Sequence, residues 1–269
     1  MRRVFKKEGF FKNNRPQDSW QKVSKWYGKI TEGEGHYHHQ KIVIPNSLKL
    51  LDLKEGDSLI DLGCGSGILG RNVNQKVSYL GLDLSENLIK EAKRQDNSRN
   101  HTYKVLDVTK DLKQINQSFS HATFILSFQN MEKGETALHE VSYHLKKDGH
   151  LLLVLNHPMF RIPRQSSWEI DKTNKLEYRR VNKYMSDLKI PINMNPGKNS
   201  SEYTWSYHYP LHRISHFLRK EGFLIETIEE WTSDKESSGK FAKMENRARS
   251  EFPLFMAILA LKKSQLVVE

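Results

Sequence analysis

The sequence predicts an α/β fold in which a mostly parallel sheet is covered by helices on both faces. Between residues 58 and 155, short apolar segments alternate with polar segments long enough to form helices. Nearly continuous apolar runs are typical of parallel strands that are buried on both faces. The five expected strands are 58–62, 78–82, 102–106, 122–127 and 150–155.

Further elements are expected on both sides of these strands. A short helix within 18–30 carries aromatic residues at three- and four-residue spacing, and a second helix covers about 38–51 with an apolar face. After the fifth strand, the sequence predicts a helix at 211–221, a strand at 223–228 and a last strand at 254–261.

Residues 158–210 form an insertion after the fifth strand. The segment is rich in Pro, Asn and Arg and has only weak periodicity. Loops of this length in a compact domain are usually functional or disordered, and aromatic residues favour the functional alternative. The aromatic residues in question are Trp168, Tyr178, Tyr184, Trp205 and Tyr207.

The strongest local signal is the segment from Leu59 to Gly70, Leu-Ile-Asp-Leu-Gly-Cys-Gly-Ser-Gly-Ile-Leu-Gly. An apolar strand here ends in Asp61 and opens into a glycine-rich turn before a helix. Glycines allow the backbone to adopt positive φ and to approach a ligand closely. The segment therefore predicts a ligand site at the end of the first strand.

Two more carboxylates occupy matching positions, Asp83 at the end of the second strand and Asp107 at the end of the third. The carboxyl ends of neighbouring parallel strands meet at one crevice, so the three should converge. Their chemistry suits a nucleoside with a cationic amino-acid tail. Asp83 can accept hydrogen bonds from both ribose hydroxyls, and Asp107 can accept one from the adenine amino group. Asp61 can orient the turn and the ammonium end of the amino-acid tail.

A dinucleotide site is the rival interpretation. Gly65, Gly67 and Gly70 match the dinucleotide fingerprint, and Asp83 lies at about the expected distance downstream. A pyrophosphate at the helix N-terminus would be repelled by Asp61, and dinucleotide sites do not require Asp107. These two carboxylates disfavour a nicotinamide or flavin enzyme.

Together, the glycine turn, Asp83, the Asp107-Val108 pair and the segment 127–130 resemble class I S-adenosylmethionine (SAM) dependent methyltransferases, particularly the type 11 group. The resemblance covers about residues 45–157. It implies a Rossmann-like seven-stranded sheet whose last strand is antiparallel, with SAM as cofactor and S-adenosylhomocysteine as product. It also makes Tyr27 and His39 candidate lid contacts. The residues assigned to the cofactor are Asp61, Gly63, Cys64, Gly65, Gly67, Asp83, Leu84, Asp107, Val108, Ser127, Tyr27 and His39.

The resemblance divides the chain into four parts. They are an N-terminal helical arm or lid (1–45), the SAM-binding core (46–157), a lid or substrate insertion (158–210), and a C-terminal helix with strands that complete the sheet (211–269).

Candidates for the acceptor side lie beside the fifth strand and on the insertion. His157 is the candidate general base because histidine titrates near neutral pH, although a capping role is an open alternative. Arg161 and Arg164 could clamp a carboxylate or phosphate, or form surface salt bridges. Trp205 and His208 complete the predicted acceptor site. The histidine cluster at 36–39 lacks companion ligands, so no metal site is expected.

The acceptor class stays open between three alternatives. The net charge of +11 is concentrated in residues 1–30, with nine Lys/Arg against two acids, and in 158–210, with nine against five. Two basic segments favour RNA or an anionic substrate. Enzymes that methylate nucleobase amines carry an Asn/Asp-Pro-Pro-aromatic segment after the fourth strand, which is absent here. This absence favours a small-molecule acceptor over RNA, and a non-catalytic SAM-binding protein is the third alternative.

The sequence also bears on location. No run of about 18 apolar residues occurs, and the basic N-terminus lacks the apolar stretch of a signal peptide. Cys64 is the single cysteine, so no internal disulfide is possible. A cytoplasmic enzyme with no membrane association is expected.

Overall fold

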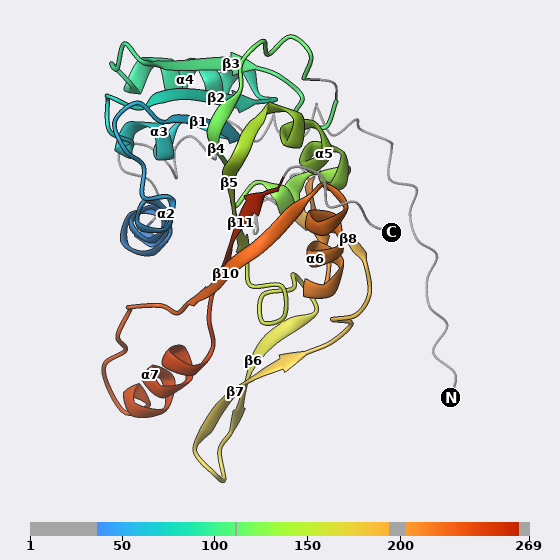
Figure 1. Cartoon of the computed structure of the whole chain (residues 1–269). Coiled ribbons are helices and arrows are strands. Elements are labelled where there is room, and N and C mark those ends of the chain that lie inside the picture. The colour runs from blue at the N-terminus through green and yellow to red at the C-terminus, as the bar shows by residue number, and fades with distance from the viewer. Residues whose placement is uncertain (1–36, 111, 194–202, 264–269) are drawn as a thin grey trace.

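The computed structural model describes residues 37–110, 112–193 and 203–263. Its centre is a seven-stranded sheet with the strand order β10-β11-β5-β4-β1-β2-β3 (Figure 1). The strands are β1 (Ser58–Leu62), β2 (Ser78–Asp83), β3 (His101–Val105), β4 (Phe119–Ile125), β5 (Leu145–Asn156), β10 (Phe223–Trp231) and β11 (Phe255–Lys262).

The strand directions confirm the predicted fold class. β1 pairs in parallel with β2 and β4, β2 with β3, and β4 with β5. The last strand, β11, runs antiparallel to both of its neighbours, β5 and β10. The carboxyl ends of β1 to β5 therefore lie at one edge of the sheet, where the predicted site residues are found.

Helices cover both faces of the sheet (Figure 1). On one face lie the π-helix η1 (His39–Val43), α2 (Ile44–Leu51), α3 (Ile68–Asn72) and α4 (Glu86–Gln95). The other face is covered by α5 (Gly134–His144) and α6 (Leu211–Lys220). Local signals fix some ends: Pro45 stands in the first turn of α2, and the Ser85 hydroxyl caps α4 by accepting from Leu88 N.

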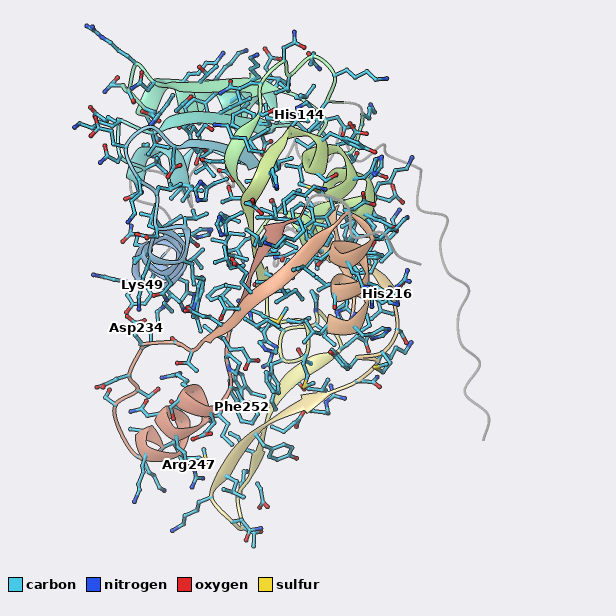
Figure 2. All side chains as sticks on the ribbon, in the orientation of Figure 1. Lys49, His144, His216, Asp234, Arg247 and Phe252 are labelled. Atoms are coloured by element: carbon cyan, nitrogen blue, oxygen red, sulfur yellow. The ribbon has the colours of Figure 1, made fainter. Side chains whose placement is uncertain are left out.

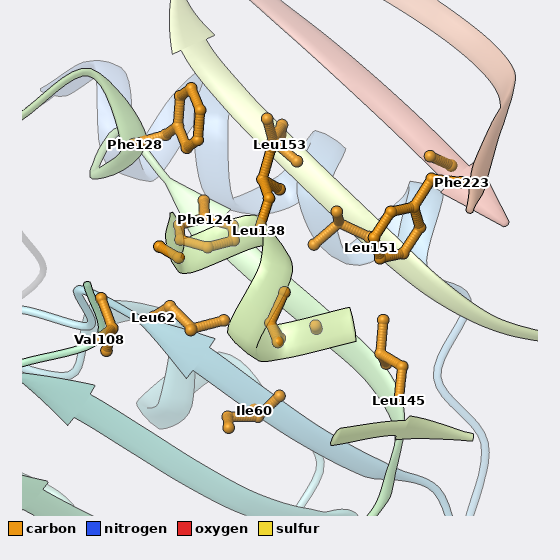
Figure 3. Close-up of a cluster of buried hydrophobic side chains, with 14 of the residues drawn as sticks. Ile60, Leu62, Val108, Phe124, Phe128, Leu138, Leu145, Leu151, Leu153 and Phe223 are labelled. Carbon is orange, nitrogen blue, oxygen red and sulfur yellow. The ribbon is translucent and has the colours of Figure 1, made fainter. Parts of the chain in front are cut away.

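Alternating side chains of the central strands separate the two faces. Ile60 and Leu62 of β1 pack under α5 and α6 (Figure 3), whereas Leu59 packs under α3 and α4. The same period of two places the Asp61 carboxylate on the face of Leu59. Hydrophobic burial on both faces thus holds the strand ends rigidly beside the glycine turn.

The insertion is more regular than the sequence predicts. It forms two antiparallel hairpins, β6 (Ser166–Asp171) with β7 (Leu176–Val181), and β8 (Leu188–Asn193) with β9 (Tyr203–His208). A further helix, α7 (Ala242–Glu251), lies in the charged segment before β11, for which no regular element was predicted. A single 3-10 turn, η2 (Phe128–Asn130), follows β4.

The hairpin β6–β7 and α7 form a lobe that projects from the sheet (Figure 1). Phe252, labelled in Figure 2, joins the two because its ring contacts both Trp168 and Phe160 edge to face. Arg247 of α7 also donates to the Lys175 carbonyl. None of the helices in the described residues is long and apolar enough to cross a membrane.

Candidate functional site

The glycine turn between β1 and α3 takes its shape from three residues with positive φ. Gly63, Gly65 and Gly67 have φ of 76°, 57° and 76°. A Cβ at Gly63 would lie 2.5 Å from the Ser127 Cβ, so no larger residue fits there without a shift of the backbone. Ser127 in turn donates a hydrogen bond of 2.6 Å to the Leu62 carbonyl. The ends of β1 and β4 are thereby locked together at the turn.

Asp61 lies beneath this turn and is only 1% exposed. The hydroxyls of Tyr79 and Thr123 donate to its carboxylate at 2.7 Å and 2.8 Å. Burial raises the pKa of Asp61 to about 6, although the two hydrogen bonds act to lower it. The two hydrogen bonds therefore do not fully offset the cost of burying the negative charge of ionised Asp61.

Asp83 completes the turn from the end of β2. It accepts hydrogen bonds from Gly65 N at 3.0 Å and from Ser85 N at 2.8 Å. Burial raises the pKa of this carboxyl as well, against the lowering effect of these backbone donors. A carboxylate tied to the backbone in this way is rigid.

Asp107 lies two residues beyond β3, whose end is tied to β2 by the Leu106 N to Asp83 O hydrogen bond of 2.9 Å. Burial raises the pKa of Asp107, but hydrogen bonds from Thr109 and Lys110 outweigh it, so the net shift is downward. The Val108 side chain belongs to the hydrophobic core, which leaves its backbone as the group available to a ligand. Leu84, which directly follows Asp83 in the chain, is half-buried.

A pocket of about 370 Å³, open solvent included, begins at Asp61 and the glycine turn and is here called the glycine-turn pocket. Six predicted cofactor residues do not line it: Gly67, Asp83, Leu84, Asp107, Val108 and Ser127. It is lined by His39, Ile44, Asp61, Gly63, Cys64, Gly65, Ser66, Ile68, Leu69 and Ile125. The structure thus brings His39 and Cys64 to the turn with the predicted glycines, and burial raises the pKa of the Cys64 thiol well above its usual value. Tyr27 lies outside the described residues.

A second pocket of about 400 Å³, here called the insertion pocket, lies at the ends of β4 and β5 and is closed by the end of β9. It is lined by Phe128, Gln129, Leu155, Asn156, His157, Pro158, Arg161, Ile162, Pro163, Ser206, Tyr207, His208, Tyr209 and Ile214. The two pockets share no lining residue: Ile125 at the end of β4 lines the first, and Phe128, three residues further along the chain, lines the second.

His157, the candidate general base, uses both ring nitrogens within the protein. Its Nε2 lies 2.6 Å from Glu230 Oε1, and its Nδ1 accepts from the backbone N–H groups of Met159 and Phe160, each at 3.2 Å. Burial lowers the pKa of His157, although Glu230 acts to raise it. This geometry is that of a cap on the turn after β5, and it offers no free lone pair for a substrate proton.

The other predicted acceptor residues separate into two groups. Arg161 and His208 line the insertion pocket, and His208 Nε2 lies 2.8 Å from the Tyr184 carbonyl. Arg164 is exposed, and Trp205 lies against Lys189, whose Nζ is 5.0 Å from the ring centroid. Neither Arg164 nor Trp205 lines the insertion pocket.

The structure adds two pocket residues that sequence reasoning missed. Gln129 accepts a hydrogen bond from Asn156 N at 3.1 Å, which ties the turn after β4 to the end of β5. Tyr207 is 7% exposed and places a buried hydroxyl in the pocket wall. Its position in an aromatic-rich insertion was the available signal. Across residues 37–110, 112–193 and 203–263, no three His, Cys, Asp or Glu side chains group as metal ligands.

Comparison with known proteins agrees with this geometry. Residues 59–149 match the model of a family described as a methyltransferase domain. A SAM-dependent methyltransferase from Mesorhizobium loti has the same fold, with a TM-score of 0.64 and 24% identity, over 82% of this chain and 99% of that one. Residues 59–149 thus form a methyltransferase domain, and the chain around it has the fold of SAM-dependent methyltransferases.

Two further proteins resemble this chain, one in sequence and one in fold. An uncharacterised protein from Methanocaldococcus jannaschii is 26% identical over 206 residues, which are 76% of each chain. The partner of the Trm112 methyltransferase activator from Haloferax volcanii, seen in a complex of the two, is 13% identical with a TM-score of 0.63. It covers 93% of this chain and 99% of its own.

The residues of the methyltransferase site fit its cofactor. SAM is a nucleoside with a sulfonium and an ammonium group, so it combines hydroxyl donors with positive charge. Both Asp61 and Asp83 have raised pKa values because their negative charge is buried. A cationic ligand would favour their ionised forms, whereas a pyrophosphate would oppose them.

Proposed function

We propose that this methyltransferase binds SAM in the glycine-turn pocket and transfers its methyl group to a small molecule held in the insertion pocket. The observation that carries the proposal is that Ile125, at the end of β4, lines one pocket, and Phe128, three residues later, lines the other. A ligand in each would bring two reacting groups together at a fixed edge of the sheet.

On the cofactor side, Asp83 would accept the ribose hydroxyls and Asp107 the adenine amino group. Asp61 would face the ammonium end and the positive charge of the sulfonium. Bound SAM would supply an electrophilic methyl group: a lone pair of the acceptor would attack its carbon in line with the sulfur–carbon bond, and that bond would break to release S-adenosylhomocysteine. The protein contributes orientation and the exclusion of water, which together account for much of the rate in such reactions.

The buried walls of the insertion pocket support a small acceptor. His157, Tyr207 and His208 are 4%, 7% and 6% exposed. A concave site lined by buried side chains suits a small molecule better than a polymer whose backbone must pass through. No residue needs to act as a nucleophile, and His157 acts here by holding the turn rather than by taking a proton.

Calorimetric binding of SAM, S-adenosylhomocysteine and NAD(H) to the full chain tests the cofactor half of the proposal. Micromolar binding of SAM or its product is expected, and binding of NAD(H) alone would overturn it. The acceptor half is tested by the release of S-adenosylhomocysteine with small-molecule fractions and with RNA. Turnover only on RNA, with affinity that falls steeply with salt, would replace the small-molecule acceptor.

A further inference from the structure

One wall of the insertion pocket carries a guanidinium that has no carboxylate partner among residues 37–110, 112–193 and 203–263. Arg161 is half-buried, and its guanidinium carbon lies 5.1 Å from the centre of the Phe255 ring. The one hydrogen bond that its guanidinium forms within the described residues is long, 3.4 Å from Nη1 to the Leu254 carbonyl. A guanidinium stacked on an aromatic ring keeps its N–H donors in its own plane, where they can reach a ligand.

A second arginine stands beside it and intensifies the positive charge. Arg179 of β7 donates from Nε to the Phe160 carbonyl at 2.6 Å and from Nη2 to the Ser166 hydroxyl at 3.1 Å. These bonds fix the guanidinium at the base of the hairpin. Burial, together with the neighbouring charge of Arg179, lowers the pKa of Arg161 to about 10.

Two neighbouring guanidinium groups without a counter-ion are unfavourable in a partly desolvated wall. Throughout the described part of the chain, neither Arg161 nor Arg179 forms an ion pair, although many other basic side chains do. The closest analogue on the same segment, Arg164, is exposed to water and needs no partner. The positive charge at Arg161 is therefore concentrated where a ligand of the pocket would meet it.

We infer that the methyl acceptor carries a carboxylate, and that Arg161 binds it while Arg179 reinforces the positive potential. This inference rests on the proposed function, because it identifies the ligand of the insertion pocket as the acceptor. The assignment makes Arg161 a specificity residue and gives the β6–β7 hairpin a part in substrate choice.

A carboxylate fits better than a phosphate for two reasons. Arg161 is the one arginine in the pocket lining, and two of the donor groups of Arg179 are already used on Phe160 and Ser166. One open guanidinium fork matches one planar carboxylate in a bidentate arrangement. The lining residues next to Arg161 in the chain, Ile162 and Pro163, together with Pro158, are apolar and offer no side-chain donors to a tetrahedral dianion.

Three small probes of one shape test the inference: benzoate, neutral benzamide and phenyl phosphate. Binding to the full chain saturated with S-adenosylhomocysteine is measured by ligand-detected NMR, which registers weak affinities. The wild type should prefer benzoate to benzamide by about tenfold or more, the usual effect of a charge-assisted pair. Equal binding of the two, or preference for phenyl phosphate over benzoate, overturns the carboxylate assignment.

Arg161→Gln should abolish the preference for benzoate, and Arg164→Gln is the matched control that should retain it. Arg161→Lys, which keeps the charge but loses the fork, should retain only part of it. A preference that survives Arg161→Gln overturns the role of Arg161. The wild-type comparison stands even if a variant is unstable. Failure of SAM to bind would contradict the proposed function, whereas the benzoate result reports on the arginine site alone.

Discussion

The Tyr79 hydroxyl on β2 donates a hydrogen bond of 2.7 Å to the buried Asp61 carboxylate on β1, beneath the glycine turn that we propose binds the cofactor. Burial raises the pKa of Asp61 to about 6 from 3.8. A cationic ligand requires ionised Asp61, so SAM affinity should rise between about pH 5 and pH 7. Calorimetric titration with SAM across this pH range tests the prediction, and Asp61→Asn should remove the rise in affinity. An affinity that is flat in the wild type would contradict a contact between Asp61 and the charge of SAM.

The same raised pKa affects folding with a defined sign. The folded state holds the Asp61 proton more tightly than the unfolded chain, so this contribution to stability is complete below about pH 4 and is lost as pH rises through about 6.

Tyr79→Phe should raise the pKa of Asp61 further and move the midpoint of the SAM affinity profile upward. Tyr143→Phe is the matched control, because Tyr143 is 70% exposed. An unmoved midpoint in Tyr79→Phe would show that the hydrogen bond does not tune Asp61.

A comparison of Gly63 with Gly56 tests whether Ser127 confines the shape of the glycine turn. Both have positive φ, 76° and 89°, but a Cβ at Gly63 would meet Ser127 at 2.5 Å, whereas at Gly56 nothing lies within 4 Å. Gly56→Ala should cost about 1 kcal/mol of unfolding free energy from backbone strain alone. Gly63→Ala should cost about 2–4 kcal/mol and should also abolish SAM binding. Equal costs in urea denaturation would show that Ser127 does not confine the turn.

The contact between His157 and Glu230 predicts a structural rather than a proton-transfer role. Because burial lowers the pKa of His157 in the folded state, its contribution to stability is present above about pH 6.5 and is lost as pH falls through the folded value. His157→Gln should therefore destabilise the protein at pH 8 and flatten the decline of melting temperature on the acid side. His216→Gln, at an exposed position on α6 that is labelled in Figure 2, should leave both unchanged. A large loss of turnover with unchanged stability would instead restore His157 as a general base.

The sequence predicts the sheet well because its strands are buried on both faces. Each central strand is an apolar run that is stable only in the protein interior. β1, for example, spans the predicted residues 58–62. The hairpin β6–β7 escaped prediction because its side chains are half-buried or exposed along both strands. Without a buried face, no hydrophobic period marks a strand. α7 escaped for a related reason, since Ala248 is its one fully buried residue.

The candidate site divides in the same way. The glycine turn, Asp61 and Asp83 can be predicted from local sequence, because each lies at the end of a strand that is itself recognisable in the sequence. Arg179 could not be predicted, because only the register of the hairpin brings it to Phe160. The role of His157 depends on Glu230, which lies 73 residues away in the chain. Such long-range pairs leave no periodic trace in one sequence.

Asp83 gives the sharpest test of the cofactor site. Asp83→Asn keeps the side-chain size, but its amide N–H₂ would face one of the backbone donors Gly65 N and Ser85 N, and it would lose the charge offered to the ribose. Loss of charge-assisted hydrogen bonds should weaken SAM binding by roughly 10- to 100-fold. Glu86→Gln, an exposed carboxylate three residues on, is the control and should leave affinity unchanged. If Asp83→Asn binds SAM as tightly as the wild type while remaining folded, the ribose does not lie at the end of β2, and the orientation proposed for the whole cofactor fails with it.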